Sequence, residues 1–426
     1  MNIQILHQHF IKSSGVCTDT RKISKDCLFF ALRGTNYNGN LFAEEALDKG
    51  ALKVIVDDRE YHHPNGNTIL VHNSLLSLQE LAKYHRKHLN LPIISLTGSN
   101  GKTTTKELIN AVLSQRFKTV ATVGNLNNHI GVPLTLLSMD ENTEIGIVEM
   151  GANHLGEIKM LSEIAEPDFG YITNFGKAHL EGFGNLEGVV KGKTELYQFL
   201  KAHDKTIFVN ANDPKQIEAS EGINKITFGP ESSNYPVAFV DGTDTLTLEF
   251  KGEKIKSNLV GTYNFPNLSA AVAIGSYFEI PVLDIKKGIE SYTPNNHRSQ
   301  LIHTKANTIL MDAYNANPSS MMAALENFKQ SKGENKIMIL GDMFELGADT
   351  EKEHQGIIDF LAENPFGKAF VTGSNFYKTQ NSSAHIHQFE TFETLRAEIE
   401  KNPPRGSNIL IKASRGMALE RILDFL

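Results

Sequence analysis

The sequence has no tryptophan, only two cysteines, and no apolar run long enough to cross a lipid bilayer. The cysteines, Cys17 and Cys27, lack the spacing of a metal site and form no disulfide framework, which favours a reducing compartment. The first ten residues lack the basic start and the apolar core of a signal peptide. We therefore expect a cytoplasmic protein that does not insert into a membrane.

The sequence also has no excess of positive charge. The 49 acidic residues outnumber the 42 basic residues and give a formal net charge of −7, which argues against a nucleic-acid partner. Any anionic ligand must therefore be held by local positive groups. The length of 426 residues exceeds what one hydrophobic core supports and indicates two or three domains.

Residues 93–113 carry the most informative pattern in the chain. A short apolar run, typical of a buried strand, leads into T-G-S-N-G-K-T-T and then into the apolar spacing of a helix. This arrangement is typical of a phosphate-binding loop, although the first glycine of the usual G-x-x-x-x-G-K-[ST] pattern would fall on Leu96. Lys102 supplies a positive charge, and the Thr103 hydroxyl suits Mg²⁺. The residues expected to contact the nucleotide are Gly98, Ser99, Asn100, Gly101, Lys102, Thr103 and Thr104.

Two later strand ends supply candidates for a metal site. Glu149 lies near the end of the apolar run 145–150, which Gly151 follows, and this position suits a Mg²⁺ ligand beside a phosphate loop. His179 follows the next buried strand in a glycine-containing loop, and the pattern leaves a structural and a functional role equally open. The spacing of Lys191 and Lys193 indicates by itself only the charged start of a helix.

The pattern of strands and helices predicts an α/β protein with three domains. In the first domain, residues 1–90, we expect strands at 27–32 and 54–56 and helices at 42–49 and 74–89. A Leu-Pro pair at 91–92 then breaks the chain and marks the first boundary.

The second domain, residues 91–294, is predicted to hold a parallel sheet with strands at 145–150 and 171–173. From about Lys225 the pattern changes to the alternation seen at 246–250, which predicts a small antiparallel insert. The third domain, residues 295–426, alternates strands and helices and is predicted to be a doubly wound, Rossmann-like unit. Its expected strands are 308–311, 336–340, 369–372 and 408–411.

Six short motifs follow one another along the chain. They are T-G-S-N-G-K-T-T, V-E-M-G-A-N, I-T-N-F-G-K-A-H-L-E-G-F-G, G-T-Y-N-F-P-N, M-D-A-Y-N-A-N-P and L-G-D-M-F-E-L-G. Together they resemble the Mur ligases of peptidoglycan synthesis, over essentially the whole chain. The motifs at 312–318 and 340–347 are the most specific, and they resemble the branch that adds D-alanyl-D-alanine. The D-N-P-R motif of the branch that adds diaminopimelate or lysine is missing.

The resemblance implies a role for each matching residue. Lys102 and Thr103 would bind ATP and a first Mg²⁺, which Glu149 would complete, and His179 would help to hold a second Mg²⁺. The carbamylated lysine of the family aligns with Lys193, through G-K-T-E, and would act as a carboxylate-like ligand. The resemblance therefore implies Lys102, His179 and Lys193 as catalytic residues, with ATP and two Mg²⁺ ions as cofactors.

The third domain and the N-terminus carry the remaining implied contacts. Asn264 would contact adenine, while Arg298 and Asp312 would contact phosphate and ribose. Thr20 and Arg21 belong to a segment similar to the family's uridine-nucleotide site. Two departures stand out: residues 38–40 read N-G-N where the family usually has D-G-H, and residues 296–300 read N-H-R-S-Q in place of a G-R-x-E-like element.

The implied reaction is an ATP-dependent amide ligation. The carboxylate of a UDP-N-acetylmuramoyl-tripeptide attacks the γ-phosphate of ATP, and the amine of D-Ala-D-Ala then displaces phosphate from the acyl phosphate. Closure about a hinge near residues 294–298 would exclude water, and Asn315 and Asn317 would meet D-Ala-D-Ala or the tripeptide end. We expect a monomer.

Two alternatives remain at this point. Folylpolyglutamate synthetase shares the loop and the carbamylated lysine but lacks the uridine-type first domain and D-A-Y-N-A-N-P. A non-catalytic nucleotide-binding switch would need the loop, but not Glu149, His179 and Lys193 together. The sequence leaves open whether residue three of the tripeptide is diaminopimelate or lysine.

Overall fold

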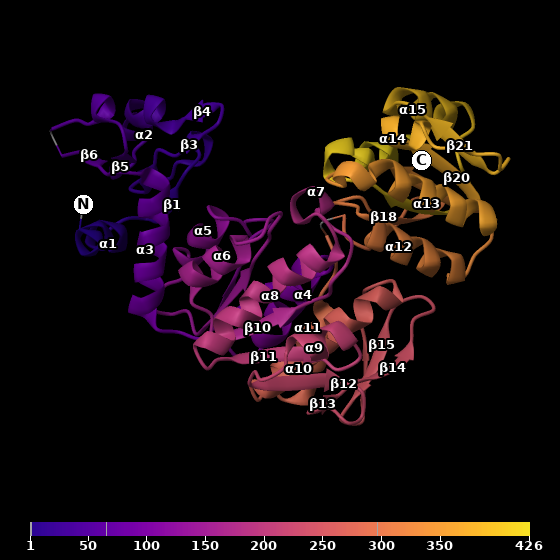
Figure 1. Cartoon of the computed structure of the whole chain (residues 1–426), viewed down its shortest axis with the longest axis horizontal. Helices are drawn as coiled ribbons and strands as arrows, with labels where there is room; N and C mark the ends of the chain where they lie inside the picture. The colour runs from indigo at the N-terminus through magenta and orange to yellow at the C-terminus, as the bar shows by residue number, and fades with distance from the viewer. Residues whose placement is uncertain (1, 65, 296) are drawn as a thin grey trace.

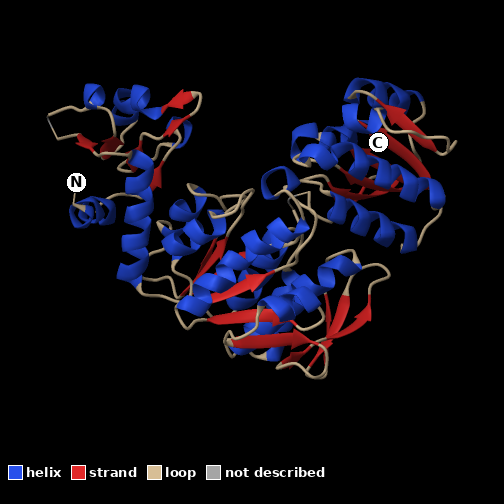
Figure 2. Cartoon of the chain, viewed as in Figure 1, coloured by secondary structure: helices blue, strands red, loops and turns tan. Residues whose placement is uncertain are grey.

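Three mainly parallel sheets organise the chain, one in each of three successive domains (Figures 1 and 2). The computed structural model describes residues 2–64, 66–295 and 297–426. The N-terminal and C-terminal domains lie on opposite sides of the central domain (Figure 1). The predicted α/β class and its three-domain organisation are confirmed.

The N-terminal domain is built on a parallel sheet with the order β1-β2-β5-β6. Its strands are β1 (Val16–Cys17), β2 (Leu28–Phe30), β5 (Lys53–Val56) and β6 (Thr68–Leu70), with a hairpin of β3 (Arg33–Gly34) and β4 (Tyr37–Asn38). Its helices are α1 (Ile3–Ile11), α2 (Ala43–Asp48) and α3 (Ser74–Leu89). The strands expected at 27–32 and 54–56 and both expected helices are present, within a few residues at each end.

Helix α3 connects this domain to the next one, and its ends follow from local chemistry. The Asn73 side chain accepts a hydrogen bond from the Leu76 N–H, and Asn90 ends the helix with a left-handed φ of 49°. In its last turn, the buried Arg86 donates to the carbonyl oxygens of Ala165 and Glu166 and to Asp168 Oδ2 at 2.7 Å. These bonds fix the C-terminal end of α3 against the central domain.

The central domain contains a seven-stranded parallel sheet in the order β13-β12-β11-β10-β7-β9-β8. Its strands are β7 (Ile93–Thr97), β8 (Thr119–Ala121), β9 (Ile145–Glu149), β10 (Phe169–Ile172), β11 (Thr206–Asn210), β12 (Lys225–Gly229) and β13 (Tyr235–Pro236). One core joins the sheet to α4 (Lys102–Leu113), α10 (Phe265–Tyr277) and α11 (Val282–Ser291). Another joins it to α5 (Gly131–Leu136), α6 (Glu157–Ala165) and α8 (Leu186–Ala202). The short helices are α7 (Leu180–Phe183) and α9 (Pro214–Ala219).

The antiparallel insert is present but begins later than expected. Its strands are β14 (Ala238–Asp241), β15 (Thr247–Phe250) and β16 (Glu253–Lys256), and Leu248 and Phe250 point into the core. The prediction that the insert starts at about Lys225 was wrong, because β12 pairs in parallel with β11 and extends the main sheet. β12 is exposed at Lys225 and becomes buried only at Phe228 and Gly229, so its sequence lacks the continuous apolar run of a central parallel strand.

The C-terminal domain contains a six-stranded sheet in the order β17-β18-β22-β19-β20-β21. Its strands are β17 (Gln300–His303), β18 (Asn307–Asp312), β19 (Lys336–Gly341), β20 (Lys368–Thr372), β21 (Ile386–Phe389) and β22 (Ser407–Lys412). Its helices are α12 (Pro318–Gln330), α13 (Thr350–Glu363), α14 (Ser374–Tyr377) and α15 (Phe392–Lys401). The four expected strands are present, and the sequence reasoning missed β17, which is antiparallel, and β21. Within the described ranges, no helix is long and apolar enough to cross a membrane.

Candidate active site

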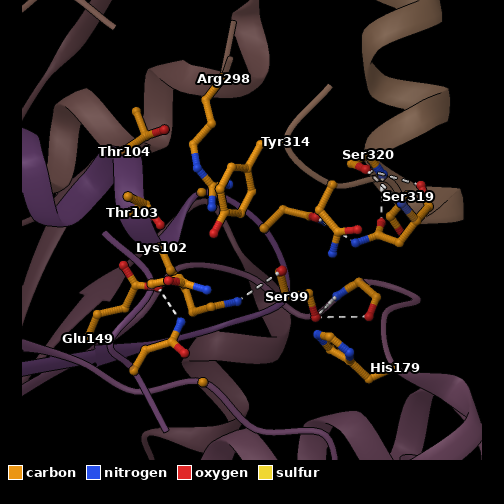
Figure 3. Close-up of a pocket in the computed structure, with 18 of the residues that line it drawn as sticks. Ser99, Lys102, Thr103, Thr104, Glu149, His179, Arg298, Tyr314, Ser319 and Ser320 are labelled. Atoms are coloured by element: carbon orange, nitrogen blue, oxygen red, sulfur yellow. Dashed lines mark hydrogen bonds between the residues drawn. The ribbon is translucent and has the colours of Figure 1, made fainter. Parts of the chain in front are cut away.

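A cavity of about 800 Å³ lies where the central and C-terminal domains meet (Figure 3). It brings together predicted site residues from six separate segments of the chain. Those that line it are Ser99, Asn100, Gly101, Lys102, Thr103, Thr104, Glu149, His179, Asn264, Arg298, Asp312, Asn315 and Asn317. The predicted residues Gly98, Lys193, Thr20 and Arg21 are not part of its lining.

The phosphate loop joins β7 to α4, and its backbone requires glycine at two positions. Gly98 has a φ of +143°, and a Cβ there would come within 2.0 Å of Thr173 Oγ1. Gly101 has a φ of +79°, and a Cβ there would come within 2.7 Å of the Asn267 side chain. Because Gly101 offers no side-chain cap, the first N–H groups of α4 remain available to an anion.

Lys102 is the first residue of α4, and its ammonium group folds back over the loop. Its Nζ donates to the carbonyl oxygens of Gly98 at 2.6 Å and Ser99 at 3.2 Å. Burial lowers the pKa of Lys102 to about 8, with a smaller contribution from Arg298, while Glu149 acts in the opposite direction. An incoming phosphate would replace the carbonyl partners with a full negative charge.

Glu149 ends β9 beside the phosphate loop, and one of its two carboxylate oxygens has no hydrogen-bond partner among the described residues. Its Oε1 accepts from Asn127 Nδ2 at 2.7 Å, whereas its buried Oε2 has no hydrogen-bond partner in the described structure. An unpaired buried carboxylate oxygen is costly unless a cation binds it. Together with Thr103 it fits one Mg²⁺ that takes its other ligands from phosphate and water. Among the described residues, no three His, Cys, Asp or Glu side chains converge as a metal site by themselves.

His179 begins α7 with a left-handed φ of 53° and faces the C-terminal domain. Its Nδ1 lies 2.5 Å from Glu345 Oε2, and this contact lowers the pKa of the Glu345 carboxyl. The Glu345 carbonyl oxygen also accepts from the Glu181 N–H at 3.1 Å. Glu345 was not predicted as a site residue, although it lies in the motif L-G-D-M-F-E-L-G.

Lys193 lies behind the wall of the cavity, buried on α8. Its Nζ donates to the carbonyl oxygen of Ala152, a lining residue, at 3.0 Å, and lies 5.0 Å from the centre of the Phe183 ring. In the part of the chain that the structure describes, no carboxylate lies within ion-pair distance of it. Burial, and then the charge of Lys102, hold the pKa of Lys193 well below its usual value. Deprotonation of this amine is therefore easier than deprotonation of an exposed lysine.

The C-terminal domain meets the loop through polar contacts. Asn317 caps α12 with its side-chain oxygen, while its Nδ2 donates to Asn100 Oδ1 at 2.8 Å. The Lys177 N–H donates to Ser319 Oγ at 2.8 Å, and Lys177 Nζ lies 2.6 Å from Glu353 Oε1. Asn100 and Asn317 therefore form a direct link between the phosphate loop and the third domain.

Asp312 lies at the end of β18, opposite Lys412 on β22. Its Oδ2 lies 2.5 Å from the buried Lys412 Nζ, and its Oδ1 accepts from the Ser299 N–H at 3.2 Å. Lys412 was not predicted, because only the pairing of the two strands brings it to Asp312. The Asp312 carboxylate thus faces the cavity while it supports the surrounding backbone.

Asn264 and Arg298 complete the side of the cavity near α10. Asn264 is buried, donates to the Val260 carbonyl oxygen at 2.9 Å, and accepts from Asn267. The Arg298 guanidinium carbon lies 3.7 Å from the centre of the Tyr314 ring, and Figure 3 shows the two side chains next to each other. Its buried Nε has no hydrogen-bond partner in the described structure. Asn296, in the expected hinge at 294–298, lies outside the described residues.

The expected uridine-site residues remain in the N-terminal domain. Arg21 is exposed and pairs with Asp19, and the Thr20 carbonyl oxygen accepts from Lys49 Nζ at 3.0 Å. In the departure at residues 38–40, Asn40 is buried and bonds to Asp57 through both ends of its side-chain amide. This asparagine therefore supports the fold at a place where the family pattern has histidine.

Comparison with known proteins gives three consecutive matches to family models. They are "Mur ligase family, catalytic domain" over residues 12–97, "Mur ligase middle domain" over 96–275, and "Mur ligase, glutamate ligase domain" over 297–415. UDP-N-acetylmuramoyl-tripeptide–D-alanyl-D-alanine ligase from Bacillus subtilis is 37% identical over 97% of this chain and 93% of its own length. The chain belongs to the Mur ligase family. The Escherichia coli protein of the same name is 32% identical and covers 98% of this chain and 94% of its own length.

Solved structures agree with this membership. The crystal structure of MurF from Acinetobacter baumannii has a TM-score of 0.88 and 29% identity, and covers 99% of this Mur ligase and 98% of its own chain. A folylpolyglutamate synthase from Mycobacterium tuberculosis is less similar, with a TM-score of 0.61, 15% identity and 82% coverage of this chain. Its likeness concerns the fold alone.

Proposed function

We propose that this Mur ligase joins D-alanyl-D-alanine to UDP-N-acetylmuramoyl-tripeptide and converts ATP into ADP and phosphate. The observation that carries the proposal is the cavity in which Lys102, Thr103 and Glu149 face Arg298 and Asp312 across the domain boundary. The names of the relatives that match nearly the whole chain supply the substrates. Such a reaction belongs to the synthesis of peptidoglycan precursors.

The three domains divide the substrates among them in this proposal. Residues 1–90 bind the uridine nucleotide, with Thr20 and Arg21 among the contacts, and residues 91–294 bind ATP. Residues 295–426 close over ATP and receive D-Ala-D-Ala near Asn315 and Asn317, which both line the cavity.

The first step joins two anions, and positive groups must offset their repulsion. The tripeptide carboxylate attacks the γ-phosphate of ATP to give an acyl phosphate and ADP. Lys102 and the N–H groups at the start of α4 stabilise the charge that develops on the phosphate. Mg²⁺ held by Thr103 and Glu149 supplies further neutralisation when it is bound. The amine of D-Ala-D-Ala then attacks the acyl carbon and phosphate leaves.

A carbamate on Lys193 is the second part of the proposal. A neutral lysine amine adds to the carbon of CO₂ and loses a proton, which gives a carbamate anion. The burial of Lys193, its lowered pKa and its lack of a carboxylate partner all favour the neutral amine that this addition needs. The carbamate and His179 would together provide ligands for a second Mg²⁺ on the side of the cavity next to Ala152.

The proposed function is tested by measuring phosphate release with each substrate omitted in turn. A ligase releases phosphate only when ATP, the UDP-tripeptide and D-Ala-D-Ala are all present. Steady hydrolysis of ATP without the dipeptide, or no turnover with the complete set, would contradict the proposal and favour a nucleotide-binding switch. Running the assay with the diaminopimelate and the lysine tripeptides identifies which residue is accepted at position three.

Replacing Asp312 with alanine is expected to raise the KM for ATP by about 10-fold or more, because one or two hydrogen bonds to a charged acceptor, at about 1.5–3 kcal/mol each, are lost. The KM for the UDP-tripeptide should change little, because the first domain holds the uridine end. Steady-state kinetics with each substrate varied in turn provides the measurement. The melting temperature of the variant should be measured as well, because the substitution also removes the carboxylate that pairs with the buried Lys412. Equal weakening of both substrates would mean that Asp312 only supports the fold or the hinge.

A further inference from the structure

A second unpaired arginine lines the cavity in addition to Arg298. Arg415 follows β22, is exposed, and its guanidinium carbon lies 5.2 Å from the centre of the Tyr314 ring. Within the described ranges, no carboxylate lies within ion-pair distance of Arg415. A guanidinium that stacks on an aromatic ring and keeps its N–H groups free is suited to bind a carboxylate or phosphate.

The surroundings of Arg415 differ from those of the phosphate loop. Arg298 and Arg415 lie 3.7 Å and 5.2 Å from the centre of the same Tyr314 ring, and the residue after Arg415, Gly416, packs against Phe344. Next to Arg415 lies Phe344, whose side chain is 41% exposed at the cavity. A Cβ on Gly416 would come within 2.9 Å of the Phe344 ring, so the ring packs directly against this glycine. The result is a cation beside an apolar wall.

Hydrogen bonds connect the two loops that form this pocket, the loop after β19 and the loop after β22. The Phe344 N–H donates to Ser414 Oγ at 2.9 Å, and Ser414 Oγ donates to the Ala316 carbonyl oxygen at 3.3 Å. The Met343 N–H donates to the buried His354 Nε2 at 3.0 Å. The loops follow the neighbouring parallel strands β19 and β22, and the carboxyl ends of such strands are where α/β sheets bind ligands.

We propose that Phe344, Arg415 and Gly416 form the binding pocket for the incoming D-alanyl-D-alanine. The Arg415 guanidinium takes the C-terminal carboxylate of the dipeptide, and the Phe344 ring contacts its methyl groups. This inference rests on the proposed ligase function and assigns the residues that select its second substrate. An extended dipeptide spans about 7 Å, so a carboxylate held at Arg415 leaves the amine to reach across the same cavity.

The test compares two acceptors that differ only in the group that Arg415 would bind. D-Alanyl-D-alanine carries a terminal carboxylate, whereas D-alanyl-D-alaninamide carries a neutral amide in its place. The wild-type enzyme should prefer the acid by about 10- to 100-fold in kcat/KM, the range for a hydrogen-bonded charge. In Arg415→Gln this preference should fall to near one, through a raised KM for the acid, with the KM for ATP unchanged.

Two further variants separate recognition from structure. Arg421→Gln is the matched control, because Arg421 also stacks on an aromatic ring, 3.6 Å from the centre of Phe392, but lies outside the cavity lining. It should keep the wild-type preference for the acid. Phe344→Ala should raise the KM for both acceptors by a similar factor, since both carry the same methyl groups.

Each outcome decides the proposal. An undiminished preference for the acid in Arg415→Gln overturns it, and so does an equal loss of activity toward both acceptors, because the amide has no carboxylate to lose. A raised KM for ATP with an unchanged acceptor preference would assign Arg415 to the nucleotide instead. If the wild-type enzyme uses neither acceptor, then the proposed ligase function is wrong. This result differs from a failure of the Arg415 proposal, because it is seen in the wild-type enzyme without any substitution.

Discussion

Replacing Lys102 with alanine is expected to lower ligation by at least about 100-fold, the usual cost of removing one donor from a site that stabilises developing charge. The lost ammonium group neutralises phosphate in the ground state and in the transition state, so weaker ATP binding and a lower kcat should appear together. The fold should survive, because among the described residues Lys102 Nζ bonds only to two carbonyl oxygens of its own loop. Steady-state kinetics with ATP varied, together with thermal unfolding, provides the measurement.

The control for this variant is Lys118→Ala, which removes an exposed lysine that does not line the cavity. It should retain wild-type kinetics. If Lys102→Ala kept more than about a tenth of the wild-type turnover, the loss would correspond to only about 1.4 kcal/mol of barrier. Lys102 would then have no catalytic role of the kind proposed.

Lys193→Ala is expected to be inactive at ambient CO₂ and to regain part of its activity when acetate is added. Removal of the long side chain leaves a buried space behind Ala152, where a small carboxylate can replace the carbamate. The loss should again reach about 100-fold, since an anionic group next to the metal and the phosphates is removed. The measurement is turnover as a function of acetate concentration, with mass spectrometry of the wild-type protein to detect the carbamate.

The matched control is Lys191→Ala, which lies two residues away on α8 but is exposed. It should keep full activity, and acetate should not affect it. An unmodified Lys193 in fully active enzyme would refute the carbamate. If no small carboxylate restored the activity of Lys193→Ala, an anion at the position of Lys193 would have no effect on turnover. Lys193 would then have only a structural role.

The features that the sequence predicted well depend on neighbours in the chain. Helix α3 was predicted from Ser74 to Leu89 because its N-cap, Asn73, and the break at Leu91-Pro92 are local signals. The phosphate loop is local as well, since glycines, a lysine and a threonine between a strand and a helix determine its shape within about ten residues. Local chemistry therefore located most of the residues that line one half of the cavity.

The features that the sequence reasoning missed depend on pairing across the fold. Lys412 meets Asp312 only because β22 lies beside β18, a hundred residues away in the chain. Glu345 meets His179 only because the third domain lies against α7. The start of the insert was misplaced for a related reason: whether Lys225–Gly229 extends the main sheet depends on its neighbour β11 and not on its own residues.

Hydrogen bonds and ion pairs, such as Asn100 with Asn317 and Lys177 with Glu353, link the central and C-terminal domains beside an apolar cluster that contains residues of both. Polar contacts of this kind separate and re-form more easily than apolar cores do, because water replaces the lost partners. If the domains close over ATP as proposed, these polar pairs are therefore the contacts that exchange most easily, whereas buried apolar residues supply most of the resistance to heat. Substitutions at the polar pairs are then expected to alter the rate of closure more than they alter the melting temperature.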